Sequence, residues 1–219
     1  MFELMCYAMS MTESARIRRK DAVRESKRAI ILEAALRVFE REGLDGASMR
    51  AIGDEAGYTA AAIYFHFESK EAIYSELLNQ SLERLIGRME GAAIGRSRPQ
   101  QRLELAALAL FDFYAENPRD LDLGFYLFRG GMKPRGITHD VDAQLNAKLA
   151  RALAVLGAAI GELGAPPRTI QLMTADLFAH AVGLLLLQHT GRIKMFGNQP
   201  RKLMQAHVAR IAQEIEDQS

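Results

Sequence analysis

Side chains that can donate hydrogen bonds to anions gather in one stretch of this sequence, residues 48–71. Thr59 and Tyr64 carry hydroxyl groups, His66 carries an imidazole, and Lys70 carries an ammonium group. Such groups are suited to phosphate oxygens, and the start of a helix is itself a site for anions. The composition of this stretch therefore indicates a surface that binds phosphate groups.

Motifs for catalysis and cofactor binding are missing from the chain. It has no Gly-x-Gly-x-x-Gly, no phosphate loop ending in Gly-Lys-Ser, no His-Glu-x-x-His and no Cys-x-x-Cys. His180 and His189 lie nine residues apart on one predicted helix, so they point to roughly opposite sides and cannot share a metal. Helix capping and solvation explain His139, Asp140 and Asp142 better than a metal does. We therefore predict no enzyme activity, no cofactor and no metal site.

Two short helices are predicted to position the phosphate-binding groups. Ser48 is placed to cap a helix over residues 49–56, and Gly57 interrupts that helix. Thr59 is placed to cap the second helix. This arrangement is a helix-turn-helix, whose second helix has the right size for the major groove of DNA. The alternative is an ordinary helical corner with an aromatic plug at residues 64–67.

Helical periodicity extends over almost the whole chain, and no stretch alternates as a half-buried strand does. A first helix over about 26–42 is expected to end at Gly43, which supplies a left-handed stop. The predicted inward-facing residues of the first three helices are Ile31, Leu32, Ala35, Phe39, Ile52, Ala56 and Ile63. Later helices are predicted from Ser69, Pro99, Pro118 and Thr138, and over 168–192 and 199–217, giving an all-α fold of about nine helices.

The overall composition is that of an ordinary globular chain. Its 219 residues include 28 Lys and Arg against 27 Asp and Glu, and 49% are apolar, which excludes a disordered chain, a collagen and a disulfide scaffold. Cys6 is the only cysteine, so a reducing cytoplasm is the default location. The apolar run 175–187 is shorter than a bilayer span and contains Asp176 and His180. We predict that it is a buried helix and that the protein has no membrane partner.

The N-terminal segment is first apolar and then basic. Residues 1–11 lack the basic start and long apolar stretch of a secretory signal, and initiation at Met9 or Met11 would remove most of them, so we expect this segment to be dispensable. Residues 16–28 hold seven basic side chains against two acids, Asp21 and Glu25. Such a run is usually a solvated face or tail, and an arm that binds nucleic acid is the alternative.

The stretch from Arg28 to Glu71 resembles the DNA-binding domain of TetR-family transcriptional regulators. The motifs that carry the resemblance are Gly43, Ser48-Met-Arg-Ala-Ile, Ala56-Gly57, Ile63-Tyr64, His66-Phe67 and Lys70-Glu71. The resemblance implies that Arg50 faces DNA. It also implies phosphate contacts by Ser48, Thr59, Tyr64, His66 and Lys70.

Departures from the family's pattern bear on how bases are read. Gly53 stands where an alanine is more usual, and Tyr58 and Ala60 replace a small β-branched residue and a polar residue. Little hydrogen-bond readout is then available beyond Arg50, Tyr58 and Thr59, while the methyl group of Ala60 can contact thymine. We expect DNA binding to be specified by Arg50, Tyr58 and the shape of the duplex.

The resemblance also implies a domain organisation and a function. A flexible N-terminal arm over 1–24 precedes a helix-turn-helix domain over 25–72 and a ligand-binding and dimerisation domain over 73–219. The implied function is that of a ligand-responsive repressor, released from a palindromic double-stranded DNA operator by a small hydrophobic effector. One alternative is a helical small-molecule-binding protein or enzyme that has lost DNA binding. Another is a DNA-binding protein without an effector.

Six of the 16 aromatic side chains fall within residues 111–128. Core packing is the simpler explanation for any one of them. Together they fit the ligand cavity that the resemblance implies, which would then be apolar, with tyrosine hydroxyls to orient the ligand. The residues predicted to contact the ligand are Phe111, Tyr114, Phe125 and Tyr126.

The predicted helix 168–192 is apolar nearly all round at residues 184–187, so one of its faces needs cover from outside its own domain. A second subunit is the simplest partner that could cover this face. The resemblance implies that this helix and the last one pair with their symmetry mates in a homodimer. The residues predicted for that interface are Leu184, Leu185, Gln188, Met204, His207 and Ile211.

Overall fold

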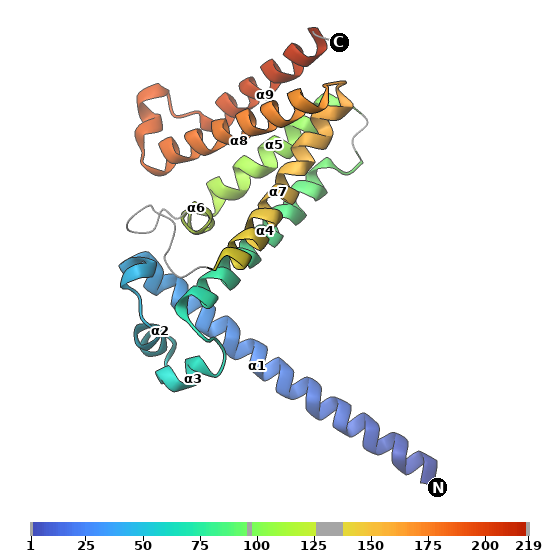
Figure 1. The fold of residues 1–219 in the computed structure, drawn as a ribbon, viewed down its shortest axis with the longest axis vertical. Helices are drawn as coiled ribbons and strands as arrows, with labels where there is room; N and C mark the ends of the chain where they lie inside the picture. Colours follow the sequence, from blue (N-terminus) through green and yellow to red (C-terminus); the bar gives the residue numbers. More distant parts are fainter. Residues whose placement is uncertain (1, 96–97, 126–137, 218–219) are drawn as a thin grey trace. The chain divides into compact units, whose positions relative to one another are not determined.

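The structure of the chain is a computed structural model that describes residues 2–95, 98–125 and 138–217, with side chains from residue 16 onward. Within these residues it has nine α-helices, one short 3-10 helix and no strand (Figure 1). The predicted all-α fold with about nine helices is therefore confirmed. The described residues form two compact units, unit 1 up to Leu77 and unit 2 from Leu78.

The first helix is longer than the sequence pattern predicted. α1 spans Phe2–Gly46, so residues that we expected to form a flexible arm are helical from Phe2 onward. Residues 2–42 contain neither glycine nor proline, and nothing in them breaks a helix even where no apolar stripe is present. Gly43 interrupts the helix as predicted, with a φ of 74° that only glycine adopts readily.

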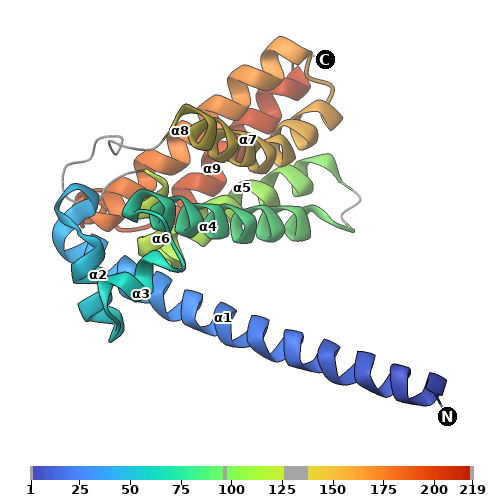
Figure 2. The same ribbon diagram turned by 60° about the horizontal axis from the view of Figure 1, so that its bottom comes forward.

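Two short helices follow, each capped by the residue that we predicted. α2 spans Met49–Ala56, and the Ser48 hydroxyl accepts a 3.1 Å hydrogen bond from the Ala51 amide. α3 spans Ala60–Tyr64, and the Thr59 hydroxyl accepts a 3.3 Å hydrogen bond from the Ala62 amide. Each cap satisfies an amide that the first turn of a helix leaves without a partner. Figures 1 and 2 show both helices beside the C-terminal half of α1, whose N-terminal half projects past them.

Unit 1 has its own apolar core. α4 spans Lys70–Ala93, and its first turns bring Tyr74 into an edge-to-face contact with Phe39 of α1, with ring centroids 5.9 Å apart. The predicted inward-facing residues are buried, except that Ala56 is half-buried. The fully buried large side chains of unit 1 are Ile31, Phe39, Ile52, Ile63, Ile73 and Tyr74.

Unit 2 is a bundle built around α5. Besides the part of α4 from Leu78 onward, its helices are α5 (Pro99–Glu116), α6 (Pro118–Gly124), α7 (His139–Glu162), α8 (Pro167–His189), η1 (Arg192–Phe196) and α9 (Pro200–Asp217). α5 packs against α7, α8 and α9, and α8 also packs against α7 and α9. Ala106 and Ala107 of α5 are fully buried, and their small side chains let the neighbouring helices approach closely.

α8 is buried on one face only. Among the helices of the described segments, it alone is long and apolar enough to cross a membrane by length and composition. Its inner face packs within unit 2 through Met173, Leu177, Ala181, Leu184 and Leu185. The prediction of a buried helix therefore holds for this face, while Leu172 and Leu186 on other faces are 64% and 47% exposed.

Candidate functional site

The outer surface of α2 and α3 carries most of the side chains predicted to contact DNA. Arg50 has 86% of its side chain exposed and lies 3.9 Å from Asp54, a separation that leaves the guanidinium accessible. Ser48 and Thr59 are exposed as well, and Tyr64 is 57% exposed. A capping hydroxyl that accepts from an amide still has its own O–H to donate to a phosphate. The surface therefore presents hydroxyl and guanidinium donors along one helix-turn-helix.

The turn between α2 and α3 depends on a close backbone approach at Gly53. The Tyr58 amide donates a 2.9 Å hydrogen bond to the Gly53 carbonyl. A Cβ atom at position 53 would lie 2.8 Å from the Tyr58 carbonyl oxygen and 3.3 Å from the Ala60 nitrogen, both backbone atoms. The glycine thus lets the turn lie directly against α2. Tyr58 and Ala60, both predicted to read bases, are half-buried at this turn.

α1 supplies positive charge to the end of α3. The Arg28 guanidinium donates a 2.8 Å hydrogen bond to the carbonyl of His66, and it also lies 4.2 Å from the ring centroid of Phe67. Burial lowers the pKa of His66, and the charges of Lys27, Arg28 and Arg24 lower it further. Sequence reasoning did not pair these cations with His66, because they are about forty residues away in the chain. An anion beside His66 would be attracted by the charges of all three α1 cations.

Lys70 is engaged differently from the prediction. Its ammonium group donates hydrogen bonds to three backbone carbonyls at the C-terminal end of α1 and directly after it, those of Leu44 at 2.8 Å, Asp45 at 3.0 Å and Ala47 at 2.9 Å. An ammonium has three donors, so these bonds use all of them. The predicted phosphate contact is corrected accordingly: in this structure Lys70 holds the α1–α2 connection against the start of α4.

A pair of arginines fixes α2 on α1. Glu55 accepts a 2.7 Å hydrogen bond from Arg37 and a 3.3 Å hydrogen bond from Arg41, both on α1. The hydrogen bond from Arg37 is the main reason that the pKa of Glu55 lies below its usual value. Lys70 thus fixes the start of α2 and Glu55 fixes its end. Together they define the orientation of the exposed face of α2.

This geometry coincides with a known family of DNA-binding domains. Residues 31–77 match the family model described as bacterial regulatory proteins, tetR family. These residues form a TetR-family DNA-binding domain. The matched residues include α2, α3 and the start of α4, so the family match covers the capped helices and the Lys70 contacts described above.

Curated transcriptional regulators are similar to this chain over part of their length. The transcriptional repressor KstR2 of Mycobacterium tuberculosis is 34% identical over 87 residues, which cover 40% of this chain and 44% of that protein. The transcriptional activator FasR of Mycolicibacterium smegmatis is 32% identical over 102 residues, 47% of each chain. The alignments thus span less than half the length of these relatives.

Solved structures share the fold over most of the chain. A putative transcriptional regulator from Pseudomonas aeruginosa PAO1 superimposes with a TM-score of 0.72 at 23% identity, covering 89% of this chain and 94% of that one. The regulator FadR from Bacillus subtilis, solved with stearoyl-CoA, gives a TM-score of 0.62 at 18% identity, covering 85% and 96%. At these identities the likeness concerns the fold.

In unit 2, the predicted ligand residues lie in or beside an aromatic cluster. Phe111 and Tyr114 are buried, whereas Phe125 is half-buried and Tyr126 lies outside the described residues. The ring of Phe125 lies 5.7 Å from that of Tyr114 and 5.8 Å from that of Phe178 on α8. Burial raises the pKa of the Tyr114 hydroxyl, so that hydroxyl stays protonated. Sequence reasoning missed Phe178, which joins the cluster only through the packing of α8.

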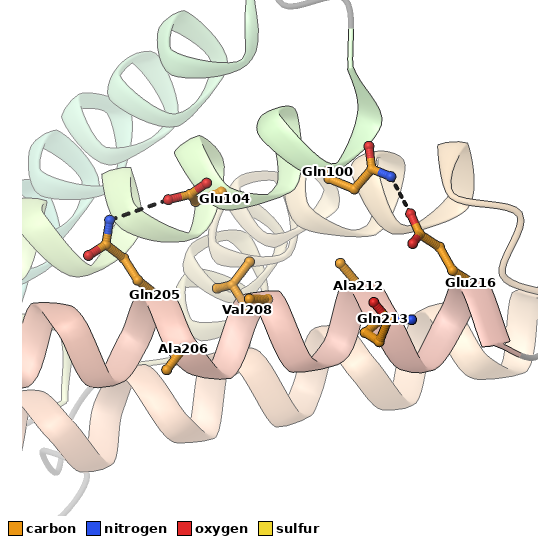
Figure 3. A pocket seen from close by; sticks show the side chains of 9 residues that line it. Gln100, Glu104, Gln205, Ala206, Val208, Ala212, Gln213 and Glu216 are labelled. Carbon is orange, nitrogen blue, oxygen red and sulfur yellow. Dashed lines mark hydrogen bonds between the residues drawn. The ribbon is translucent and has the colours of Figure 1, made fainter.

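A surface groove of about 480 Å³ lies elsewhere in unit 2, between α5 and α9 (Figure 3). Gln100 hydrogen-bonds to Glu216 across it, and Gln205 donates a 3.3 Å hydrogen bond to Glu104. Its floor includes Ala212. None of the predicted ligand residues lines this groove, whose polar bridges join α9 to α5.

The residues predicted for the dimer interface lie mostly inside unit 2. Leu184, Leu185, Met204, His207 and Ile211 are each less than 9% exposed, and Gln188 is half-buried. His207 is held there by Asp176, 2.9 Å from its ring nitrogen, and by stacking on His180. The predicted assignment is therefore corrected for the five buried side chains, which belong to the interior of unit 2, while that of Gln188 stays a prediction. The exposed apolar residues of α8 form another face, which we call the α8 stripe: Leu172, Ala175, Ala179 and Leu186.

Proposed function

We propose that this TetR-family chain is a transcriptional repressor that binds a palindromic DNA operator as a homodimer in the cytoplasm. A small hydrophobic effector, bound in unit 2, releases it. The observation that carries the proposal is the helix-turn-helix surface, on which capped helices present exposed Arg50, Thr59 and Tyr64 beside the cations of α1. The name of the relative KstR2 supports repression, whereas that of FasR is the reason to measure the sign of regulation.

On DNA, α3 enters the major groove and the surrounding donors bind the two strands. The hydroxyls of Ser48, Thr59 and Tyr64 position the domain on phosphates, which fixes its register without reading sequence. Arg50 is the strongest candidate for base reading, because its guanidinium is exposed and can form two hydrogen bonds to a guanine. The half-buried Tyr58 adds a contact at the turn.

The second subunit covers the α8 stripe. Leu172, Ala175, Ala179 and Leu186 recur at helical spacing along one side of α8 and are exposed in the single chain. A two-fold axis across this stripe makes the interface self-complementary, as in most homodimers. Two α3 helices then reach successive major grooves when their separation is near one helical turn, about 34–36 Å.

The effector site that we propose is the cluster of Tyr114, Phe125 and Phe178. Its rings supply apolar surface, and the protonated Tyr114 hydroxyl can orient a polar group of the ligand. The stearoyl-CoA in the B. subtilis FadR structure makes long acyl compounds a rational part of an effector library. Replacing Phe125 with Ala should weaken release by the effector and leave DNA affinity unchanged.

The test begins with the DNA that the wild-type protein enriches from random oligonucleotides. A palindrome with half-sites one helical turn apart supports the proposal, and enrichment of no sequence overturns it. Arg50→Ala should cost about 1–3 kcal/mol on the selected site and relax one base position. Arg168→Ala removes an exposed charge from unit 2 and is the control. Gel shifts with the effector library then measure release.

A further inference from the structure

The face of α1 that covers the core of unit 1 continues toward the N-terminus as a row of cations. Arg16, Lys20, Arg24 and Lys27 recur at spacings of four, four and three residues, and all four are exposed. At 3.6 residues per turn they fall within an arc of about 80°. We call them the α1 cation row.

The row is in line with buried residues of the same helix. Ile31, Ala34 and Val38 are at most 1% exposed, and they continue the same arc of α1 toward its C-terminus. The two acids of this region, Asp21 and Glu25, fall outside the arc of about 80°. One side of α1 therefore changes from an apolar surface that packs on α2 and α4 to a cationic surface that packs on nothing described in unit 1.

The row begins beside the candidate DNA-binding surface. Arg28, one residue past Lys27, hydrogen-bonds to the carbonyl of His66 at the end of α3. Arg24 and Lys27 are close enough to His66 to act on its charge. From there α1 extends past α2 and α3, as Figures 1 and 2 show. The row thus starts where phosphate is expected and leads away from α3.

We propose that the α1 cation row binds the phosphate backbone of duplex DNA as a preformed helix, extending the contact beyond the groove that α3 enters. This inference rests on the proposed function, because it concerns the same DNA. From Arg16 to Lys27 the helix rises about 16 Å, which matches the axial length of about five base pairs. Because the helix exists before binding, its backbone is already ordered. Binding DNA therefore costs less conformational entropy than it would for a flexible arm.

A rigid row and a flexible arm make different predictions. In a flexible arm every cation contributes about equally, whereas on a helix only those of one face do. Arg18 and Arg19 are exposed, lie in the same segment and point away from the row, so they are the matched control for Lys20 and Arg24. Alanine keeps the helix in both double variants.

The experiment measures the affinity for the selected operator and for non-specific duplex between about 50 and 200 mM salt. For Lys20→Ala with Arg24→Ala, the slope of log affinity against log salt should become shallower by about 1.8, since each neutralised phosphate contributes about 0.9. Affinity should fall equally on both duplexes. For Arg18→Ala with Arg19→Ala the slope should stay within about 0.5 of wild type. A third variant, Ala22→Pro, keeps every charge but breaks the helix, and should also make the slope shallower.

Each other outcome overturns the inference. Equal slope changes in the two double variants mean a flexible arm, and unchanged slopes in both mean that the row does not touch DNA. A row that instead binds an acidic protein gives unchanged slopes as well. In all three cases wild-type binding to the selected operator still stands, so the proposed function survives. Failure of the wild-type protein to select any DNA overturns the proposed function itself.

Discussion

The ammonium group of Lys70 donates a 2.8 Å hydrogen bond to the backbone carbonyl of Leu44, and so ties the start of α4 to the C-terminal end of α1. The same ammonium group also donates hydrogen bonds to the carbonyls of Asp45 and Ala47. α4 contributes residues to both units, and α2 begins directly after these residues. Lys70 is therefore a positioning residue for α2.

Replacing Lys70 with Met should destabilise unit 1 while leaving the salt dependence of DNA binding unchanged. Methionine keeps an unbranched stem but leaves three carbonyls without their donor, and hydrogen bonds to charged groups contribute about 1.5–3 kcal/mol. We expect the free energy of unfolding to fall by about 2 kcal/mol. Chemical denaturation and binding across a salt series measure the two quantities.

The control for this variant is Lys27→Met, which removes an exposed charge from α1. It should leave stability unchanged and make the salt slope shallower by about 0.9. The opposite result, in which Lys70→Met has full stability and a shallower slope, would show that the Lys70 ammonium leaves its carbonyls and binds phosphate.

Binding to DNA should tighten as pH falls, and His66 should be the cause. Burial and three nearby α1 cations hold the pKa of His66 below its usual value in the free protein. A phosphate beside the ring stabilises the imidazolium and raises that pKa, so binding takes up a proton. The affinity for operator should therefore increase from pH 7.5 to pH 5.5, and His66→Gln should remove most of the increase. An identical pH dependence in both proteins would exclude His66 from the phosphate contacts.

The same depressed pKa has the opposite effect on stability. The unfolded chain, in which the histidine has its ordinary pKa of about 6.5, takes up the proton before the folded chain does. The contribution of His66 to stability is thus complete above about pH 6.5 and declines below it, down to the lower pKa of the folded protein. Measuring both quantities on one sample separates binding from folding: toward acid pH, affinity rises while stability falls.

Local features of the fold could be predicted from the sequence, and distant contacts could not. The caps at Ser48 and Thr59 depend on residue types within three positions, so the pattern alone identified them. The acceptors of Lys70 are backbone carbonyls more than twenty positions away, and a carbonyl has no residue type to recognise. Leu185 fits a core and an interface equally well, because helical spacing shows that a face is apolar but not what covers it.

The predicted start of α1, near residue 26, was wrong for a related reason. The apolar stripe stops at Ile31, and among the described side chains the next contact of α1 with the rest of unit 1 is made by the Arg28 guanidinium, to His66 and Phe67. The helix nevertheless continues to Phe2, because no glycine or proline interrupts it. A stripe marks where a helix is covered and not where it begins. The α1 cation row lies N-terminal to this stripe, so a search for amphipathic helices does not find it.

Gly53→Ala should reduce both stability and DNA affinity. The added methyl group would lie 2.8 Å from the Tyr58 carbonyl oxygen, so the turn must move away from α2, at a cost of about 1–3 kcal/mol. Gly87 is the matched control, because a Cβ atom there meets nothing within 4 Å in the middle of α4. Gly87→Ala should stabilise the protein by about 0.5–1 kcal/mol. Equal effects of the two changes on unfolding would remove the role assigned to Gly53.

Two adjacent leucines of α8 distinguish the core of unit 2 from the proposed dimer interface. Leu185 is 2% exposed and Leu186 is 47% exposed. Leu185→Glu buries a charge without a partner, which costs several kcal/mol and should give unfolded or aggregated protein. Leu186→Glu places its charge on the α8 stripe, so each chain should keep its helical content and thermal transition but sediment as a monomer.

The loss of the dimer should then appear in DNA binding. A monomer presents one α3 to one half-site, and its affinity no longer includes the second half-site that the dimer holds at a fixed distance. For Leu186→Glu we expect the affinity for the full operator to fall by at least a hundredfold and to equal the affinity for an isolated half-site. A dimer that survives Leu186→Glu, with wild-type affinity, would mean that the subunits meet elsewhere. Because both leucines belong to one helix and receive the same charge, the difference between the two variants depends only on which face of α8 carries it.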